Sequence, residues 1–467
     1  MKKILFIKPK DKYFYAVIPN LGLGYLASIL VSEGHHVDIL DCNKCADSEA
    51  EFDQYVRKNE YDVFGFQVYT SGIVNAAVMM KKARQSYPGA LIIAGGPHPS
   101  GDPADTYESL PDTDLVVVGE SEKVIAKITG LSRKDLKNYD LLAKIDNIVY
   151  RGANGNLVYN KVKFIEDLDT LSFPRWELID PGSYPMSPHG TFSRAYPTAP
   201  IITSRGCPYP CTFCTVSKIF GKRIRQRSVK NVLDEMECLD KKYGIKEFHI
   251  EDDNFTIKKD YVLEFCRGIS ERGLNIWWAC PNGIRADKID KEMLKAMEKS
   301  GCYSFAFGIE SGSKRVLKKM NKSITLDEIE KKVSMVKKLT KIQVTGFFLI
   351  GYPGETVEDL EQTLSFSRKL KLDKASFSPV MPLPGSSIYN DWKKNINTER
   401  IEWDKFLYYQ IVPGVSDIDE NLLAAYLKKA FIGFYLRPRI IAETLIQVKT
   451  IHQLKALLKR IKTVLFK

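Results

Sequence analysis

Short apolar runs alternate with helix-length segments along residues 1–130 of this chain. The predicted strands are 4–7, 37–40, 63–68, 91–94 and 115–118, with helices over 21–32 and 74–86. Strands that alternate with helices form parallel sheets, and near-continuously apolar strands indicate that both faces are covered. The pattern predicts a doubly wound, Rossmann-like α/β domain over residues 1–130.

A second block with the same rhythm occupies residues 195–395. Its predicted strands are 201–203, 247–250, 276–278, 304–307, 344–350 and 375–377. Six such strands with helices between them are typical of a partial (β/α)6 barrel of the TIM type. We expect residues 131–194 to be a linker with a hairpin near 152–155, and residues 396–467 to be a C-terminal helical extension.

The charge distribution argues against a general nucleic-acid-binding surface. The formal net charge is +12, but ten Lys or Arg and one acid lie between Lys428 and Lys467. The rest of the chain is close to neutral. No apolar run approaches the roughly 18 residues of a membrane span, and the opening residues 1–8 read as a strand, not a signal peptide. We therefore expect a cytoplasmic protein with no nucleic-acid partner.

Three cysteines follow the first predicted strand of the second block, in the sequence Cys207-Pro-Tyr-Pro-Cys211-Thr-Phe-Cys214. A loop this short lets three thiolates converge on one metal centre. Iron–sulfur clusters usually take four cysteines, so three without a clear fourth leave one iron open to a small molecule. A structural zinc site and three unrelated thiols are the alternatives. Zinc sites usually pair two CxxC motifs, so the spacing favours an iron–sulfur cluster.

The surrounding residues resemble the radical S-adenosylmethionine superfamily over roughly residues 195–395. Residues 204–214 match the cluster loop of that family, including the aromatic Phe213 before the last cysteine. Further landmarks follow in the family's order at 251–255, 285, 307–313, 346–356 and 382–389. The resemblance implies a 4Fe–4S cluster on the three cysteines, with S-adenosylmethionine bound at the open iron and cleaved to a radical.

The same resemblance implies a set of S-adenosylmethionine contacts. The set is Phe213, Glu251, Asp252, Asp253, Arg285, Glu310, Ser311 and Gly351. In that family, the acidic residues after the second barrel strand meet the methionine amino group, and Glu310 lies near the ribose hydroxyls. Gly351 lets the backbone approach the adenine. The alternatives are a solvated loop or helix cap for the three acids at 251–253, and a buried structural carboxylate for Glu310.

Glycines follow several predicted strand ends of the first block, within residues 19–27, 94–99 and 118–122. They allow a large ligand to lie at the carboxyl edge of the sheet, although the absence of GxGxxG makes a dinucleotide a weak hypothesis. Together with the barrel, this block resembles cobalamin-binding radical enzymes such as anaerobic magnesium-protoporphyrin monomethyl ester cyclases and radical carbon methylases. The implied cobalamin contacts are Leu21, Gly22, Ser71, Gly95, Gly96, Pro97, Gly119 and Glu120. A vestigial module that only mediates contacts is the alternative.

One departure concerns the cobalt ligand. Classical cobalamin domains supply a His from a DxHxxG motif after the first strand, whereas residues 8–15 contain no His. We therefore expect cobalamin to bind without a protein His on cobalt. Residues 69–71 are candidates for the lower axial face, and His98 is a disfavoured one. Cys42 and Cys45 form a lone CxxC, which we interpret as incidental thiols and not as a second metal site.

The resemblance implies a cobalamin-dependent radical methyltransferase. A 5′-deoxyadenosyl radical takes hydrogen from an unactivated carbon of a small, apolar substrate, and methylcobalamin supplies the methyl group. A one-electron donor such as flavodoxin or ferredoxin is implied.

Oxidative cyclisation or rearrangement with the same cofactors stays open, because fold and cofactors do not fix the reaction. A sensor or electron carrier without turnover is disfavoured because it needs no open iron. A transfer-RNA methylthiotransferase would need a second three-cysteine set.

The end of the sequence predicts a basic amphipathic helix. Its apolar stripe is formed by Ile451, Leu454, Leu458, Ile461 and Leu465, and lysines flank the stripe. Such a helix can lie on an anionic membrane surface, which would make the protein peripheral at the membrane. The alternative is that the stripe packs on the barrel and the lysines stay solvated.

Overall fold

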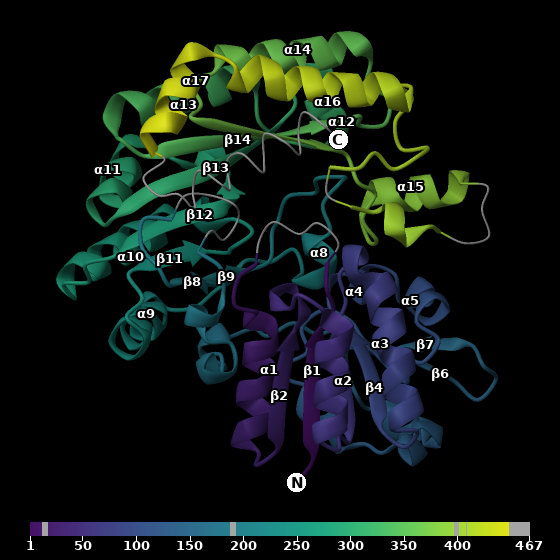
Figure 1. Ribbon diagram of the computed structural model, residues 1–467. Helices are drawn as coiled ribbons and strands as arrows, with labels where there is room; N and C mark the ends of the chain where they lie inside the picture. The colour runs from purple at the N-terminus through teal and green to yellow at the C-terminus, as the bar shows by residue number, and fades with distance from the viewer. Residues whose placement is uncertain (12–16, 187–192, 397–400, 408, 448–467) are drawn as a thin grey trace.

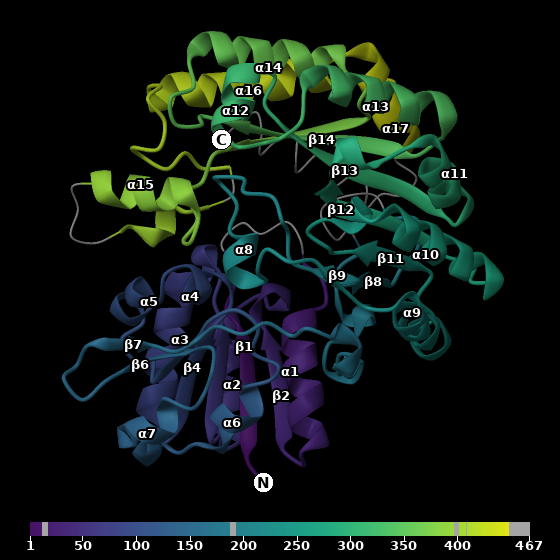
Figure 2. The same cartoon turned by 180° about the vertical axis from the view of Figure 1, so that it is seen from behind.

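The computed structural model describes residues 1–11, 17–186, 193–396, 401–407 and 409–447 (Figure 1). Two sheets organise these residues, one in each predicted block. The carboxyl ends of the parallel strands β1 to β5 in the first sheet point toward the second sheet, and the short helix α8 (Val216–Ile219) lies between the two sheets (Figures 1 and 2). Among these residues, no helix is both long and apolar enough to cross a membrane.

The first sheet has seven strands in the order β2-β1-β3-β4-β5-β6-β7. They are β1 (Lys3–Lys8), β2 (His36–Asp41), β3 (Val63–Gln67), β4 (Leu91–Gly95), β5 (Leu115–Val117), β6 (Ile148–Arg151) and β7 (Leu157–Tyr159). Strands β1 to β5 are parallel. The chain places β2 on one side of β1 and then adds β3, β4 and β5 on the other side, so the order of strand addition reverses between β1 and β3. This is the doubly wound order in which ligands bind beside that reversal, at the carboxyl ends.

The helices of the first domain cover both faces of this sheet (Figures 1 and 2). They are α1 (Leu21–Ser32), α2 (Ser48–Lys58), α3 (Ile73–Ser86), α4 (Pro97–Gly101), α5 (Pro103–Ser109), α6 (Ile125–Gly130) and α7 (Tyr139–Leu142). Helix α1 begins after Asn20, whose side chain accepts a hydrogen bond from the Leu23 N–H and caps the helix. The five strands and two helices predicted for this block are all present. The predicted hairpin is also present, as β6 and β7, and its strands extend the first sheet in antiparallel pairing.

The second sheet has six parallel strands that follow one another in chain order. They are β8 (Thr198–Ile201), β11 (Glu247–Ile250), β12 (Trp277–Ile284), β13 (Cys302–Glu310), β14 (Gln343–Ile350) and β15 (Lys374–Pro379). Its helices are α9 (Val229–Tyr243), α10 (Lys259–Glu271), α11 (Lys291–Lys299), α12 (Lys314–Lys319), α13 (Leu326–Leu339) and α14 (Val357–Lys369). The six predicted strands thus form one parallel sheet, and in the described part of the chain β15 and β8 are its two edges.

One predicted strand is shifted. The sequence predicts residues 201–203, whereas β8 ends at Ile201. The reason is local, because the Thr203 N–H donates to the Asp252 carboxylate at 2.6 Å and so leaves the strand ladder. The chain then turns into the segment that carries the cysteines.

The C-terminal part is helical where the structure describes it. It contains α15 (Ser387–Asn395), α16 (Glu420–Tyr435) and α17 (Pro438–Gln447). Helix α16 packs on β15 beside α14, whereas α15 docks on the first domain. The Tyr389 hydroxyl donates to Asp102 at 2.8 Å, and both domains contribute to one buried apolar cluster. The amphipathic helix predicted over residues 451–465 lies outside the described residues.

Candidate active site

The three cysteines lie on a loop that is closed at its base by a two-stranded ribbon. The ribbon is formed by β9 (Ser204–Arg205) and β10 (Arg225–Gln226), which pair antiparallel. Gly206 starts the loop with a φ of +94°, a backbone conformation that favours glycine. The Cys207 N–H then donates to the Gly221 carbonyl at 3.2 Å, which ties the first cysteine to the far side of the loop.

The thiols are half-buried and electrostatically coupled. Burial, together with the neighbouring Asp253, Cys211 and Cys207, raises the pKa of Cys214 to about 12. Burial likewise raises the pKa of the Cys207 and Cys211 thiols, although the nearby Arg285 guanidinium opposes it. Binding a metal must therefore displace protons from these thiols, and the cations beside them favour the charged form.

The three thiols of the loop are the donor type that iron–sulfur clusters use. Within the described ranges, no group of three or more His, Cys, Asp or Glu is arranged to hold one metal ion. A cluster makes a different demand, because each cysteine binds a separate iron. Arg285 is fixed beside the loop, with its guanidinium 3.8 Å from the centre of the Tyr209 ring and 2.7 Å from the Ser323 carbonyl.

The three acids after β11 have different environments. Asp252 is buried and accepts hydrogen bonds from the Thr203 hydroxyl at 2.5 Å and the Ser204 hydroxyl at 2.6 Å. Its carboxylate therefore fixes the segment that leads into the cysteine loop, which is a structural role. The contact of Asp252 with the methionine amino group stays a prediction. Glu251 accepts from the Asn282 amide at 2.8 Å. Asp253 lies near the thiols, and burial followed by the Asp252 charge raises its pKa to about 7.

On β13, Glu310 ends the strand with a φ of +66° and accepts from the Lys322 ammonium at 2.6 Å. The Lys322 charge also opposes the rise in the pKa of Cys211, so this ion pair lies beside the cysteine loop. Ser311 is fully buried and bonds to the Thr363 hydroxyl at 3.0 Å and to the Ser313 N–H, which again is a structural role.

Gly351 follows β14 with a φ of +83°. A Cβ at this position would lie 2.6 Å from the Leu423 side chain on α16. The positive φ and the close approach of α16 both require glycine here. The approach of adenine to this backbone stays a prediction. The Gly351 N–H donates to Glu355 at 2.6 Å, as does the Tyr352 N–H at 3.1 Å.

The stability of the protein should depend on pH through Glu355, the side chain that accepts hydrogen bonds from this turn. Its side chain is buried, its Oε1 has no hydrogen-bond partner in the structure described, and burial raises its pKa to about 7. A raised pKa in an acid stabilises the fold below the unfolded-state pKa, and this stability is lost as the pH rises toward 7. E355Q should therefore be more stable than wild type, by under about 1 kcal/mol at pH 5 and about 3 kcal/mol at pH 8.

Urea unfolding at the two pH values measures this difference. E358Q is the matched control, because Glu358 is exposed in the first turn of α14, three residues after Glu355. Equal stabilities of E355Q and wild type at pH 8 would contradict a raised pKa of Glu355.

The residues expected to contact cobalamin gather at the carboxyl ends of β1, β3, β4 and β5. Leu21 and Gly22 begin α1, Gly95 ends β4, and Gly96 and Pro97 lead into α4. Gly96 has a φ of +104°, and a Cβ there would lie 3.0 Å from the Val68 carbonyl, so its backbone requires glycine. A Cβ at Gly95 would meet only ordinary contacts, which leaves this position open to a ligand.

A buried ion pair that the sequence did not predict lies at the carboxyl end of β1, beside the point where the order of strand addition reverses. The Lys8 ammonium lies 2.5 Å from Asp11 and 4.1 Å from the centre of the Tyr69 ring. The Ser71 hydroxyl donates to the same Asp11 at 2.8 Å. Burial, and then the charges of Asp11 and Glu251, raise the pKa of Tyr69, so this ring lies between the first domain and the barrel. The sequence did contain a signal for this ion pair, because the charged Lys8 ends an otherwise apolar strand.

His98 is buried, and both ring nitrogens have partners. Nδ1 is 3.2 Å from the Thr70 hydroxyl and Nε2 is 3.0 Å from Asp105. Both ring nitrogens are thus used within the first domain. Cys42 is fully buried and Cys45 half-buried. Their shared hydrogen bond raises the pKa of Cys42 and lowers that of Cys45, and they belong to no metal-binding group that the structure describes.

The Gly119–Glu120 turn follows β5, as predicted, but the Glu120 side chain points to the barrel domain. Its carboxylate bonds to Arg205 at 3.2 Å and to Arg225 at 2.7 Å. The side chain is buried and both of its oxygens accept hydrogen bonds from the barrel domain. The contact of Glu120 with cobalamin stays a prediction.

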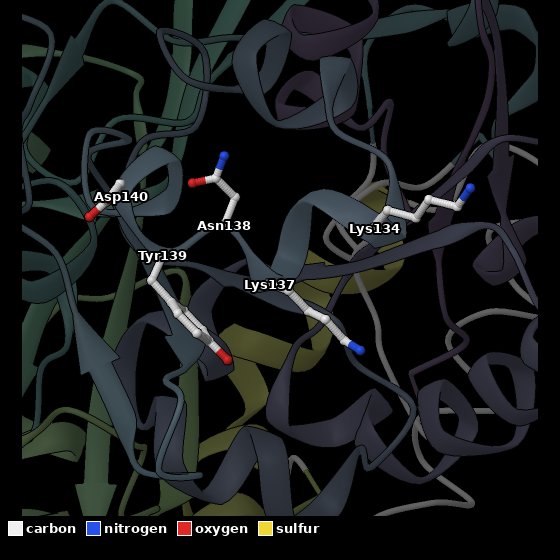
Figure 3. A pocket seen from close by; sticks show the side chains of 5 residues that line it. All are labelled: Lys134, Lys137, Asn138, Tyr139 and Asp140. Atoms are coloured by element: carbon white, nitrogen blue, oxygen red, sulfur yellow. The ribbon is translucent and has the colours of Figure 1, made fainter.

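A surface depression lies elsewhere on the first domain (Figure 3). It is lined by Lys134, Lys137, Asn138, Tyr139 and Asp140. Helix α7, which carries part of this lining, lies at the end of the first domain that faces away from the barrel (Figure 2). The depression is therefore separate from the candidate active site.

Comparisons with known proteins agree with this architecture. The Radical SAM superfamily matches residues 201–367, and the B12 binding domain matches residues 12–129. A relative from Pyrococcus horikoshii, named only as an uncharacterized methyltransferase, is 31% identical over 452 residues, which cover 96% of this chain and 95% of the relative. The anaerobic magnesium-protoporphyrin IX monomethyl ester cyclase of Rubrivivax gelatinosus is 25% identical over 445 residues, which cover 92% of this chain and 79% of the cyclase.

A solved structure shares the whole fold. The radical S-adenosylmethionine methyltransferase TsrM from Kitasatospora setae, with tryptophan substrate and an S-adenosylmethionine analog bound, has a TM-score of 0.71 at 18% identity. The match covers 94% of this chain and 90% of TsrM. The predicted fold, family and cofactors are confirmed. The chain belongs to the cobalamin-binding family of radical S-adenosylmethionine enzymes, whose cofactors are a 4Fe–4S cluster, S-adenosylmethionine and cobalamin.

Proposed function

We propose that this chain is a cobalamin-dependent radical S-adenosylmethionine methyltransferase that acts on an unactivated carbon of a small molecule. The observation that carries the proposal is the contact between the cysteine loop and the cobalamin-binding face. Helix α8 of the loop packs against α4, and the Gly119 turn lies against the Ile219 carbonyl. The two cofactors would therefore flank one reaction space.

When bound, the cluster and cobalamin supply the electron transfer and the methyl group. The protein binds these cofactors and orients them. Cys207, Cys211 and Cys214 hold the cluster, and Glu251 and Asp253 are the acids left to meet the methionine amino group. Both residues follow β11 at its carboxyl end, where barrel enzymes place their chemistry.

The opposite side of the reaction space would be formed by Glu310, Lys322 and Arg285. Glu310 accepts a hydrogen bond from Lys322 and retains a second oxygen for the ribose hydroxyls. The buried Arg285 places positive charge beside the cysteine loop, whereas the charges of Lys322 and Glu310 act in opposite directions on the pKa of Cys211. Tyr69 and Ser71 from the first domain are the proposed neighbours of the lower face of cobalamin.

Radical cyclisation is the second candidate, because the cyclase from Rubrivivax gelatinosus shares most of its length with this chain. Product analysis after anaerobic turnover with candidate substrates separates the two. Methylation yields S-adenosylhomocysteine together with 5′-deoxyadenosine. 5′-Deoxyadenosine without S-adenosylhomocysteine would contradict methylation and favour cyclisation or rearrangement.

The first domain should bind cobalamin without a protein His on cobalt. The reason is that His98 uses both of its ring nitrogens, and residues 8–15 contain no His. Electron paramagnetic resonance of the Co(II) form tests this. Nitrogen hyperfine splitting from an axial protein imidazole would contradict the expectation, and H98A, which lacks that imidazole, identifies its source. Absence of cobalamin binding would contradict the assignment of the domain.

We further propose a one-electron donor such as flavodoxin or ferredoxin, an apolar substrate, and peripheral contact with an anionic membrane. Helix α17 supports the membrane contact, because Ile441, Leu445 and Ile446 are exposed at 42%, 58% and 76%. Lysines follow in the sequence, and each basic residue near an anionic surface adds about 1 kcal/mol of binding.

Deletion of residues 447–467 should abolish cosedimentation with anionic vesicles at low salt, while folding and cofactor content stay intact. Neutral vesicles provide the control for charge. A full-length protein that ignores anionic vesicles at low salt would contradict the membrane contact, and an insoluble truncation would favour packing of this segment on the barrel.

A further inference from the structure

Two arginines face each other at the base of the cysteine loop. In the ribbon formed by β9 and β10, Arg205 lies directly opposite Arg225. Side chains at such positions share one face of the ribbon, and like charges there are destabilising. Both arginines are about 95% buried, so water does not screen the repulsion. The ribbon therefore needs an anionic partner to stay closed.

That partner comes from the first domain. The Glu120 carboxylate accepts from Arg205 Nη1 at 3.2 Å through Oε1 and from Arg225 Nη1 at 2.7 Å through Oε2. The Ile165 N–H donates to the same Oε2 at 2.6 Å. Glu122 accepts from Arg205 Nη2 at 2.6 Å. Two acids thus balance two bases in a buried cluster, and of the two acids Glu120 alone bonds to both arginines.

The same turn borders the cobalamin-binding face. Gly119 precedes Glu120 and has a φ of +71°. The Gly119 N–H donates to the Ser100 hydroxyl at 3.0 Å, which connects the turn to α4. A Cβ at Gly119 would lie 3.4 Å from the Ile219 carbonyl, so the helix of the cysteine loop passes directly over the turn. A ligand that moves this turn would also move the carboxylate that closes the loop.

We propose that Glu120 is a positioning residue that fixes the cysteine loop against the cobalamin-binding face and couples cobalamin occupancy to the geometry of the cluster. The inference rests on the proposed function for the presence of the two cofactors. The ion pairs that carry it belong to the chain alone, so the first test uses the protein without cofactors.

The first test is the alkylation rate of individual cysteines in the full-length apoprotein, followed by peptide mass spectrometry. In E120Q, Cys207, Cys211 and Cys214 should react about fivefold faster or more, because two buried guanidinium groups lose their shared partner and the loop opens. Cys238 is exposed on α9 and is the internal reference, with an unchanged rate. Unchanged rates at the three loop cysteines would overturn the proposal.

E166Q is the matched control. Glu166 also pairs with an arginine of the cysteine loop, Arg223, at 2.7 Å, but the two side chains are 66% and 78% exposed. An exposed ion pair contributes little, so E166Q should stay within about twofold of wild type. A fivefold increase in E166Q as well would show that any lost charge opens the loop, which would overturn the special role of Glu120.

The second test is the electron paramagnetic resonance spectrum of the reduced cluster with and without cobalamin. Wild type should show a cobalamin-dependent change in the spectrum, and E120Q should lose it although both cofactors bind. A retained response in E120Q would overturn the coupling. If the wild type binds no iron, the proposed function fails, whereas the alkylation result still tests the ion-pair cluster.

A charge-balanced variant covers the case in which E120Q does not fold. E120Q/R225Q removes one acid and one base together and leaves the Arg205–Glu122 pair. It should restore the protection of the three cysteines to within about twofold of wild type, while the response to cobalamin stays lost. Cysteines that remain unprotected in this variant would overturn the proposal.

Discussion

Replacement of Cys207, Cys211 or Cys214 by alanine is expected to abolish cleavage of S-adenosylmethionine. Two thiolates cannot hold a site-open cluster, and the three cysteines share one loop whose ends are fixed by β9 and β10. Reconstituted wild type should bind about four irons per chain, and each variant should lose nearly all of them. Iron analysis and the yield of 5′-deoxyadenosine measure both effects.

C238A provides the control for this series, because Cys238 is exposed on α9 and should keep wild-type iron. Full activity in any of the three loop variants would contradict the cluster assignment. About eight irons in wild type, with half lost in C42A, would show that Cys42 and Cys45 hold a second cluster.

Gly206→Ala is expected to have the second largest effect, with loss of cluster binding and a destabilisation of about 3 kcal/mol or more. Gly206 has a φ of +94°, and a Cβ there would lie 2.3 Å from the Arg223 carbonyl oxygen. Backbone atoms on both sides of the ribbon cannot move apart without opening the cysteine loop. Iron content after reconstitution and urea unfolding measure the two consequences.

The matched control is Gly244→Ala. Gly244 ends α9 with a φ of +67°, but a Cβ there would have no atom within 4 Å. This variant should cost only about 1 kcal/mol and should keep its iron, because it carries the backbone strain without the clash. Equal iron content in the Gly206 and Gly244 variants would contradict the view that close packing of the ribbon forms the cluster site.

The sequence predicted the strands and the cysteine loop because these features are local. Apolar runs and the CxxxCxxC spacing can be read without knowing what they contact. The doubly wound order and the partial barrel then follow from the alternation of strands and helices. The same local signals located the glycines at the carboxyl ends of β4 and β5.

The roles of Asp252 and Glu120 could not be read in the same way. Asp252 bonds to Thr203, 49 positions earlier, and Glu120 bonds to arginines 85 and 105 positions later. A motif shows that a carboxylate follows a strand, but only the fold shows which partner it meets. Gly351 is a similar case, because the residue that requires its lack of a side chain, Leu423, comes from α16.

Elemental analysis of iron and cobalt in one anaerobically reconstituted sample tests the central claim most directly. We expect about four irons and one cobalt per chain, because the cysteine loop holds one cluster and the first domain holds one cobalamin. Iron without cobalt after incubation with cobalamin would contradict the proposed role of the first domain. Cobalt without iron would contradict the cluster on Cys207, Cys211 and Cys214.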